Sequence, residues 1–137
     1  MQQQPPATAL TDERIVFLAL WVSDLEKSAA FYRDSLGVAF HEGFNEPVGD
    51  PWIDGRHYEL SWREGAYFHF ALFPVRQGGQ VTSGAEVGFS VDDVDAKHER
   101  LVATGVEVVH EPKTWKGLRT ARYRDLDGNV VSFTQRL

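Results

Sequence analysis

Residues 20–32 read Leu20-Trp21-Val22-Ser23-Asp24-Leu25-Glu26-Lys27-Ser28-Ala29-Ala30-Phe31-Tyr32, and this stretch decides the fold. It ends an apolar run that begins at Ile15 and then opens a helical pattern. Ser23, with Glu26 three residues later, has the spacing of a capping box, so we expect the helix to begin there. Gly37 is a residue that often follows the end of a helix. The apolar positions that recur on one helical face are Leu25, Ala29, Tyr32 and Leu36.

The same order of features returns 69 residues further along the chain. Val91-Asp92-Asp93-Val94 corresponds to Val22-Ser23-Asp24-Leu25, and His110-Glu111 corresponds to His41-Glu42. Asp92 or Asp93 is expected to cap a second helix, which Gly105 ends. The face of that helix carries Val94, His98, Leu101 and Val102. An internal repeat of this kind predicts two copies of one supersecondary unit.

Each predicted helix is followed by three segments that are typical of strands. They cover residues 38–43, 57–63 and 66–75 in the first copy, and 106–110, 119–124 and 129–135 in the second. The sequence therefore predicts an α+β domain over residues 14–137, built from two βαβββ modules whose curved mixed sheets surround a cleft. Module one spans 14–76, a linker spans 77–84 and module two spans 85–137. Residues 1–13 are expected to form a disordered or extended tail.

Composition limits the classes of function. The chain has 137 residues, 42% of them hydrophobic, which fits one globular domain. It contains no cysteine, so disulfides and thiolate chemistry are excluded. A formal net charge of -6 argues against nucleic acid as a partner. The longest apolar run, 15–22, is too short to span a membrane, and the first residues do not form a secretory signal. We therefore expect a cytoplasmic protein with neither nucleic acid nor membrane as a partner.

Two segments carry a resemblance to a known family. Residues 20–32 resemble the first strand and helix of the vicinal oxygen chelate superfamily, which includes glyoxalases, bleomycin resistance proteins and extradiol dioxygenases. Tyr123-Arg124-Asp125-Leu126-Asp127-Gly128-Asn129 resembles its closing RDPDGN turn, with Leu126 in place of the usual proline. The likeness extends over residues 14–137. It implies a small single-domain member that forms a homodimer and holds a small molecule in its cleft.

The resemblance also implies where a metal would bind. Metal enzymes of the superfamily place their ligands at positions that correspond here to Phe17, His69, Glu86 and Ser132. Only two of these four are histidine or carboxylate side chains, whereas a catalytic divalent metal generally has at least three. We therefore expect no cofactor and no catalytic metal, although weak divalent binding through His69 and Glu86 stays open.

Nine residues are candidates for the site. Glu86 and His69 are the candidate catalytic groups, as acid and base. The alternatives are a solvated or salt-bridged Glu86 and a hydrogen-bonded structural His69. The candidate ligand-binding residues are Phe17, Trp21, Tyr67, Ser132, Trp52, Arg119 and Tyr123. The aromatic residues among them could instead belong to the core or to a dimer contact, and Arg119 could pair with a nearby acid. The other histidines, which show no ligand spacing along the chain, are interpreted as structural: His41, His57, His98 and His110.

Two functions remain open. The first is a bleomycin-resistance-like protein that binds a small aromatic or cationic molecule without a catalytic metal. The second is an enzyme of the same superfamily, a glyoxalase-like lyase, an isomerase or a dioxygenase, in which Glu86 and His69 act as acid and base or as weak metal ligands. Whether the protein catalyses a reaction is left undecided by the sequence.

Overall fold

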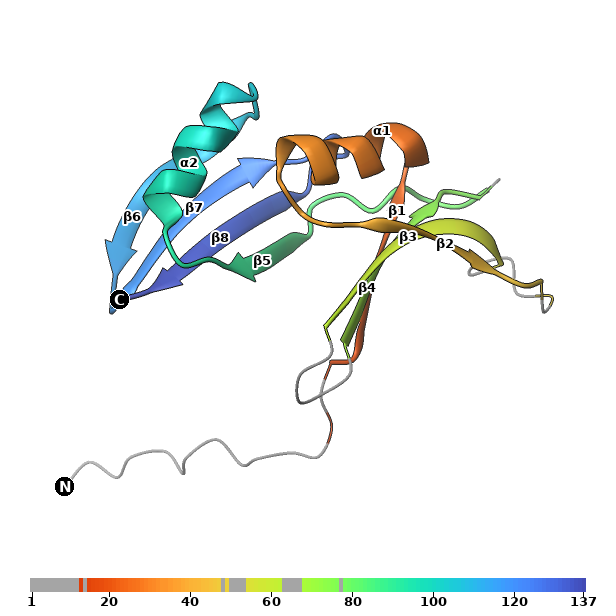
Figure 1. The fold of residues 1–137 in the computed structure, drawn as a ribbon. Coiled ribbons are helices and arrows are strands. Elements are labelled where there is room, and N and C mark those ends of the chain that lie inside the picture. The colour runs from red at the N-terminus through yellow and green to blue at the C-terminus, as the bar shows by residue number, and fades with distance from the viewer. Residues whose placement is uncertain (1–12, 14, 48, 50–53, 63–67, 77) are drawn as a thin grey trace.

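The computed structural model describes residues 13, 15–47, 49, 54–62, 68–76 and 78–137 (Figure 1). Most of the predicted tail, Trp52 and Tyr67 lie outside these residues. The first module contains β1 (Phe17–Val22), α1 (Leu25–Ala30), a π-helical turn η1 (Phe31–Ser35), β2 (His41–Asn45), β3 (Gly55–Trp62) and β4 (Phe68–Pro74). The second contains β5 (Glu86–Ser90), α2 (Val94–Ala103), β6 (Val108–Trp115), β7 (Leu118–Arg124) and β8 (Val130–Arg136).

The two modules share one topology. The first sheet has the order β1-β4-β3-β2 and the second has the order β5-β8-β7-β6. In each, the first and last strands are parallel and the other pairs are antiparallel. The predicted α+β fold of two βαβββ modules with mixed sheets is confirmed. None of the helices in the described ranges is both long and apolar enough to cross a membrane.

The helix starts differ in one respect from the expectation. Asp24, not Ser23, caps α1, because its carboxylate accepts a hydrogen bond from the Lys27 backbone N–H at 3.1 Å. The capping box predicted at Ser23 is therefore wrong. The Ser23 hydroxyl instead donates to Asp127 at 2.6 Å and so joins the two modules. Asp93 caps α2 in the same way as Asp24 caps α1, through the Ala96 backbone N–H.

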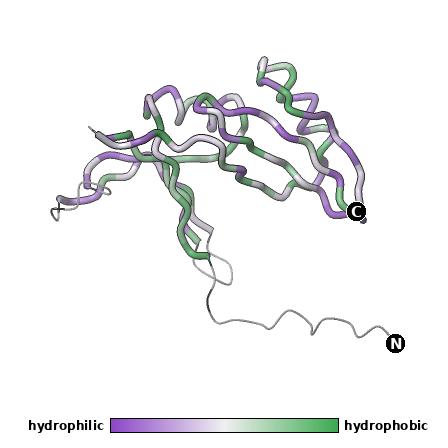
Figure 2. The backbone as a smooth tube through the Cα atoms, turned by 180° about the vertical axis from the view of Figure 1, so that it is seen from behind, coloured by the Kyte–Doolittle hydropathy of each residue, from purple (hydrophilic) through white to green (hydrophobic). Residues whose placement is uncertain are grey.

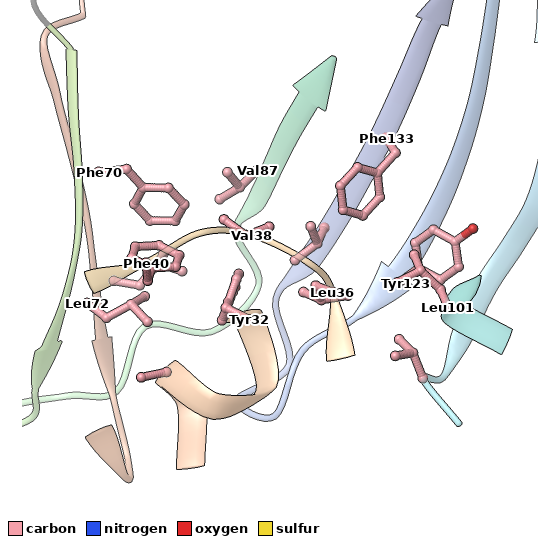
Figure 3. Close-up of a cluster of buried hydrophobic side chains, with 14 of the residues drawn as sticks. Tyr32, Leu36, Val38, Phe40, Phe70, Leu72, Val87, Leu101, Tyr123 and Phe133 are labelled. Atoms are coloured by element: carbon pink, nitrogen blue, oxygen red, sulfur yellow. The ribbon is translucent and has the colours of Figure 1, made fainter. Parts of the chain in front are cut away.

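One apolar core serves both modules. Side chains alternate along β1, so that Leu20 and Val22 are buried while Phe17 is turned to the opposite face. Figure 3 shows Phe70 of the first sheet pointing toward Val87 and Phe133 of the second, with the first helix beside them. The two most apolar strands, β1 and β4, run side by side and stand out in Figure 2. The core therefore lies on the helix-bearing side of both sheets.

The closing turn of the second module fastens it to the first. Asp125 is buried, and its carboxylate accepts a hydrogen bond from the Tyr32 hydroxyl at 2.7 Å. The same carboxylate accepts bonds from the backbone N–H groups of Asp127 and Asn129 and from the Asn129 amide. Leu126 is exposed, so the turn does not depend on proline at that position. The turn is thus a structural connection between the modules.

The buried Tyr32 hydroxyl makes the free energy of unfolding depend on pH in the alkaline range. Burial, with the nearby Asp125 charge, raises the pKa of Tyr32 well above its ordinary value of 10. Above pH 10 the unfolded chain loses this proton first, so the free energy of unfolding should fall as pH rises. We expect a shallower fall between pH 9 and 11 in Tyr32→Phe, measured by urea unfolding at each pH. Equal slopes for the two proteins would contradict this.

Candidate functional site

The first sheet carries aromatic residues on the face that points away from the core. Phe17 and His69 are partners across β1 and β4, and their rings stack with centroids 5.7 Å apart. Trp21 lies on the same face and stacks on Phe73 at 5.6 Å. Phe17 is 46% exposed, so this aromatic surface is open to solvent in the single chain.

A cluster of two histidines and a carboxylate lies beside this aromatic surface. Glu59 Oε2 is 3.0 Å from His57 Nε2 and 3.0 Å from His69 Nε2. Ser61 Oγ lies 2.9 Å from the other ring nitrogen of His69. Burial alone would raise the pKa of the Glu59 carboxyl, but the hydrogen bond from His57 and the charges of the surrounding histidines outweigh it and lower that pKa.

The second sheet has a hollow on its outward face. Glu86 and Ser132 both lie there, on neighbouring strands, and the hollow has a volume of about 520 Å³. Gly88 lies directly beside Ser132, where an added Cβ would be only 2.9 Å from the serine oxygen. The other lining residues are His110, Lys113, Thr114, Trp115, Leu118, Thr120, Arg122 and Thr134. The hollow thus combines hydroxyl groups, charges and the exposed ring of Trp115.

Glu86 is held by a salt bridge within this hollow. Arg122 Nε donates to the two carboxylate oxygens at 2.9 and 3.1 Å. Arg122 also donates through Nη1 to His110 Nε2 at 2.7 Å. Of the arrangements that the sequence left open for Glu86, the salt bridge is the one observed. The carboxylate charge is therefore compensated by a neighbouring side chain.

Arg119 and Tyr123 lie on the other face of the second sheet. Arg119 forms a two-pronged ion pair with Asp95 of α2. Tyr123 is fully buried, its hydroxyl lies 2.7 Å from His98 Nδ1, and burial raises its pKa to about 12. Both side chains face the helix, away from the side of the sheet that carries Glu86 and Ser132, and we leave them out of the candidate site.

The four positions at which the family would bind metal form two separate pairs. Phe17 and His69 lie on the first sheet, Glu86 and Ser132 lie on the second, and the core lies between these outward faces. Phenylalanine cannot coordinate a metal, a neutral serine hydroxyl is a weak ligand, and Glu86 is bound to Arg122. The residues at these four positions therefore do not fit a catalytic metal.

A second hollow lies between the two sheets, with a volume of about 510 Å³. Its walls are mostly apolar, and among the predicted site residues that the structure describes, Glu86 alone reaches it. Its lining residues are Ile15, Leu18, Trp62, Phe68, Phe70, Glu86, Val87, Gly88, Phe89 and Ser90. Ile15 and Trp62 in this lining are exposed, so the hollow opens to solvent.

Sequence reasoning missed His57 and Glu59. The interpretation of His57 as simply structural rested on spacing along the chain, but its neighbours Glu59 and His69 come from the same strand and the next one. The spacing of His57 and Glu59, two residues apart in a strand, was a usable signal, because such residues share a face. That His69 faces them depends on the strand register, which the sequence did not supply.

The chain belongs to the Glyoxalase/Bleomycin resistance protein/Dioxygenase superfamily, whose family model matches residues 14–133. This confirms the resemblance seen in the sequence. Among curated proteins, the uncharacterized protein YraH of Bacillus subtilis (strain 168) is 30% identical over 128 residues, which cover 90% of this chain and 99% of YraH.

Solved structures show the same fold. TnmS3, an antibiotic binding protein from Streptomyces sp. CB03234, is 28% identical with a TM-score of 0.68, and the match covers 96% of this chain and all of TnmS3. A glyoxalase/bleomycin resistance protein from the same organism is 30% identical with a TM-score of 0.66, over 89% of this chain and 100% of that one.

Proposed function

We propose that this protein binds a small, planar aromatic molecule in the hollow on the outward face of the second sheet, and that it does so without a catalytic metal. The observation that carries the proposal is the composition of that hollow. Trp115 offers a flat ring, while Ser132 and Thr120 offer hydroxyl groups that can bond the polar edge of a ligand. The likeness to an antibiotic binding protein supports the same class of function.

The charges of the hollow favour an aromatic ligand over a cationic one. Glu86 is neutralised by Arg122, and Lys113 adds a further positive charge to the lining. A cation would therefore meet no free carboxylate among these lining residues. Hydroxyl or carbonyl groups on a planar ring system would instead find donors in Arg122 and Lys113.

The proposal can be tested with Trp115→Ala. The probes are planar polycyclic compounds that carry hydroxyl and carbonyl groups, including antibiotics of that kind, and binding is measured by thermal shift and by quenching of tryptophan fluorescence. Trp115 is 67% exposed, so its removal should leave the fold intact. We expect affinity for the best probe to fall by roughly five- to tenfold.

Two control variants locate the ligand. Leu126→Ala removes an exposed apolar side chain in the closing turn and should leave affinity unchanged. Trp62→Ala removes an aromatic wall of the hollow between the sheets. If Trp62→Ala weakens binding while Trp115→Ala does not, the ligand occupies that other hollow and the proposal is wrong. Saturable binding with the probe recovered chemically unchanged would support a binding protein.

The structure supports the enzyme hypothesis less than it supports the binding hypothesis. An acid and a base must each exchange a proton with the reacting centre, so neither side chain can stay committed to another partner. Each is held by its own partner, Arg122 for Glu86 and Glu59 for His69. Ligand binding requires neither side chain to leave its partner, so binding explains the arrangement more simply than catalysis does.

A homodimer would bring the two outward faces together. Phe17 of the first sheet and Trp115 and Leu118 of the second are exposed in the single chain, and a second copy could cover them. We infer that the ligand is enclosed between the first sheet of one copy and the second sheet of the other. Sedimentation at the concentrations used for binding should show a dimer, and a monomer that binds the probe fully would contradict this arrangement.

A further inference from the structure

We propose that His57, Glu59 and His69 form a binding site for a divalent transition-metal ion such as Zn²⁺ on the outward face of the first sheet. The site differs from the four positions discussed above, sharing only His69 with them. Its three residues come from the first sheet, whereas the ligand hollow of the same chain is lined by the second sheet. Two imidazoles and one carboxylate make a ligand set that zinc accepts, with further positions left open.

The ligand atoms are spaced for a common ion. One oxygen or nitrogen from each of the three residues lies within 4.8 Å of the other two. Ligands about 2.1 Å from a tetrahedral ion lie roughly 3.4 Å apart. The two observed distances of 3.0 Å from Glu59 to the histidine nitrogens are therefore short of that value by only a few tenths of an ångström. Small side-chain rotations would admit the ion.

Hydrogen-bond partners at Nδ1 of each histidine leave Nε2, the proposed coordinating nitrogen, directed toward Glu59. His57 Nδ1 lies 3.3 Å from the Gly55 carbonyl oxygen, which can only accept, so Nδ1 carries the proton. His57 Nε2 then faces Glu59 either as an imidazolium N–H or as a lone pair directed at a cation. In His69 the Ser61 hydroxyl lies 2.9 Å from Nδ1, and when this hydroxyl accepts the Nδ1 proton, Nε2 is left to face Glu59. Outer contacts of this kind orient the histidines of metal sites.

The backbone leaves space over the cluster. Gly43 lies opposite His57 on β2, and a Cβ there would be 2.7 Å from His57 Nε2 and 2.9 Å from a Glu59 oxygen. Any larger residue at Gly43 would collide with two of the three proposed ligands. His41 lies at the rim of the cluster, 3.6 Å from Glu59, where it could close a fourth position.

The cluster is also held rigidly. His57 is only 2% exposed and stacks on Phe73 at 5.1 Å, while His69 stacks on Phe17. Rings fixed in this way lose little freedom when an ion binds. The competing interpretation is that protons alone bridge the cluster, as histidine–glutamate ion pairs.

The test is titration of the full chain with metal alone. Protein freed of metal by a chelator, which is then removed, is titrated with ZnCl₂ by calorimetry and with CoCl₂ by visible absorption. We expect one equivalent to bind saturably, and Co²⁺ to show the strong visible bands of a low-coordinate site. Glu59→Gln and His69→Gln should each weaken Zn²⁺ binding by at least roughly tenfold. Both residues are partly exposed, so these variants should fold, which circular dichroism can check.

Matched controls separate this site from adventitious binding. His98→Gln and Glu107→Gln change the same residue types in the second module, where His98 contacts Tyr123 and Glu107 pairs with Arg124. They should bind Zn²⁺ as the unmodified chain does. The proposal is overturned if the chain binds no stoichiometric ion, or if folded Glu59→Gln and His69→Gln bind it as tightly as the controls. Neither result would bear on the aromatic ligand, which is measured separately with Trp115→Ala.

Discussion

Replacement of Asp125 by alanine is expected to lower the free energy of unfolding by about 3–5 kcal/mol, because it leaves several donors unpaired. The Asp125 carboxylate accepts from the Tyr32 hydroxyl and from the backbone of its own turn. Asp125 is 7% exposed, and Tyr32 only 1%. Water can therefore reach the unpaired donors only if the surrounding structure moves. Urea unfolding followed by circular dichroism measures the change.

The matched control is Asp92→Ala. Asp92 is exposed and precedes the cap of α2, so its removal should alter the free energy of unfolding by no more than about 0.5 kcal/mol. A loss below about 1 kcal/mol in Asp125→Ala would mean that the turn is not the connection between modules that we describe.

Replacement of Phe70 by alanine is also expected to cost about 3–5 kcal/mol, the range for removing a large buried ring. Phe70 is 1% exposed and contacts Phe40 of its own module at 5.0 Å between centroids. It also stacks on Phe89 of the second module at 6.1 Å. The cavity would therefore open where the two modules meet.

Phe44→Ala provides the comparison for Phe70. Phe44 is the same residue type at a position 62% exposed, so its loss should change stability by about 0.5 kcal/mol or less. Because the core is shared, we expect Phe70→Ala to unfold in one transition at a lower urea concentration. Two separated transitions would show that each module has an independent core.

Much of the fold could be predicted from local patterns. Alternation along the first strand separates Leu20 and Val22 from Phe17, and the structure buries the first two and exposes the third. The apolar spacing of the first helix correctly identified Ala29 and Tyr32 as buried. Such patterns repeat at intervals set by the backbone, so they can be read without knowing which strands are neighbours.

Interactions between distant residues could not be predicted in this way. Ser23 fits a capping box locally, yet its hydroxyl bonds Asp127, 104 residues away. Arg119 and Tyr123 are predicted ligand-binding residues. The register of β7 against β8 pairs Arg119 with Gln135 and Tyr123 with Val131, and it places both side chains on the face that meets α2. The positions of these two side chains depend on how β7 pairs with β8, and the sequence alone does not give that pairing.

The shared core has a consequence for anyone who wishes to divide or recombine this chain. A fragment that stops after β4 would present Phe70 to water, because Phe89 of the second half covers part of its ring. Tyr32 would likewise lose Asp125, its buried acceptor. The two modules have the same topology, but each depends on the other for part of its core. Neither module is expected to fold when it is separated from the other.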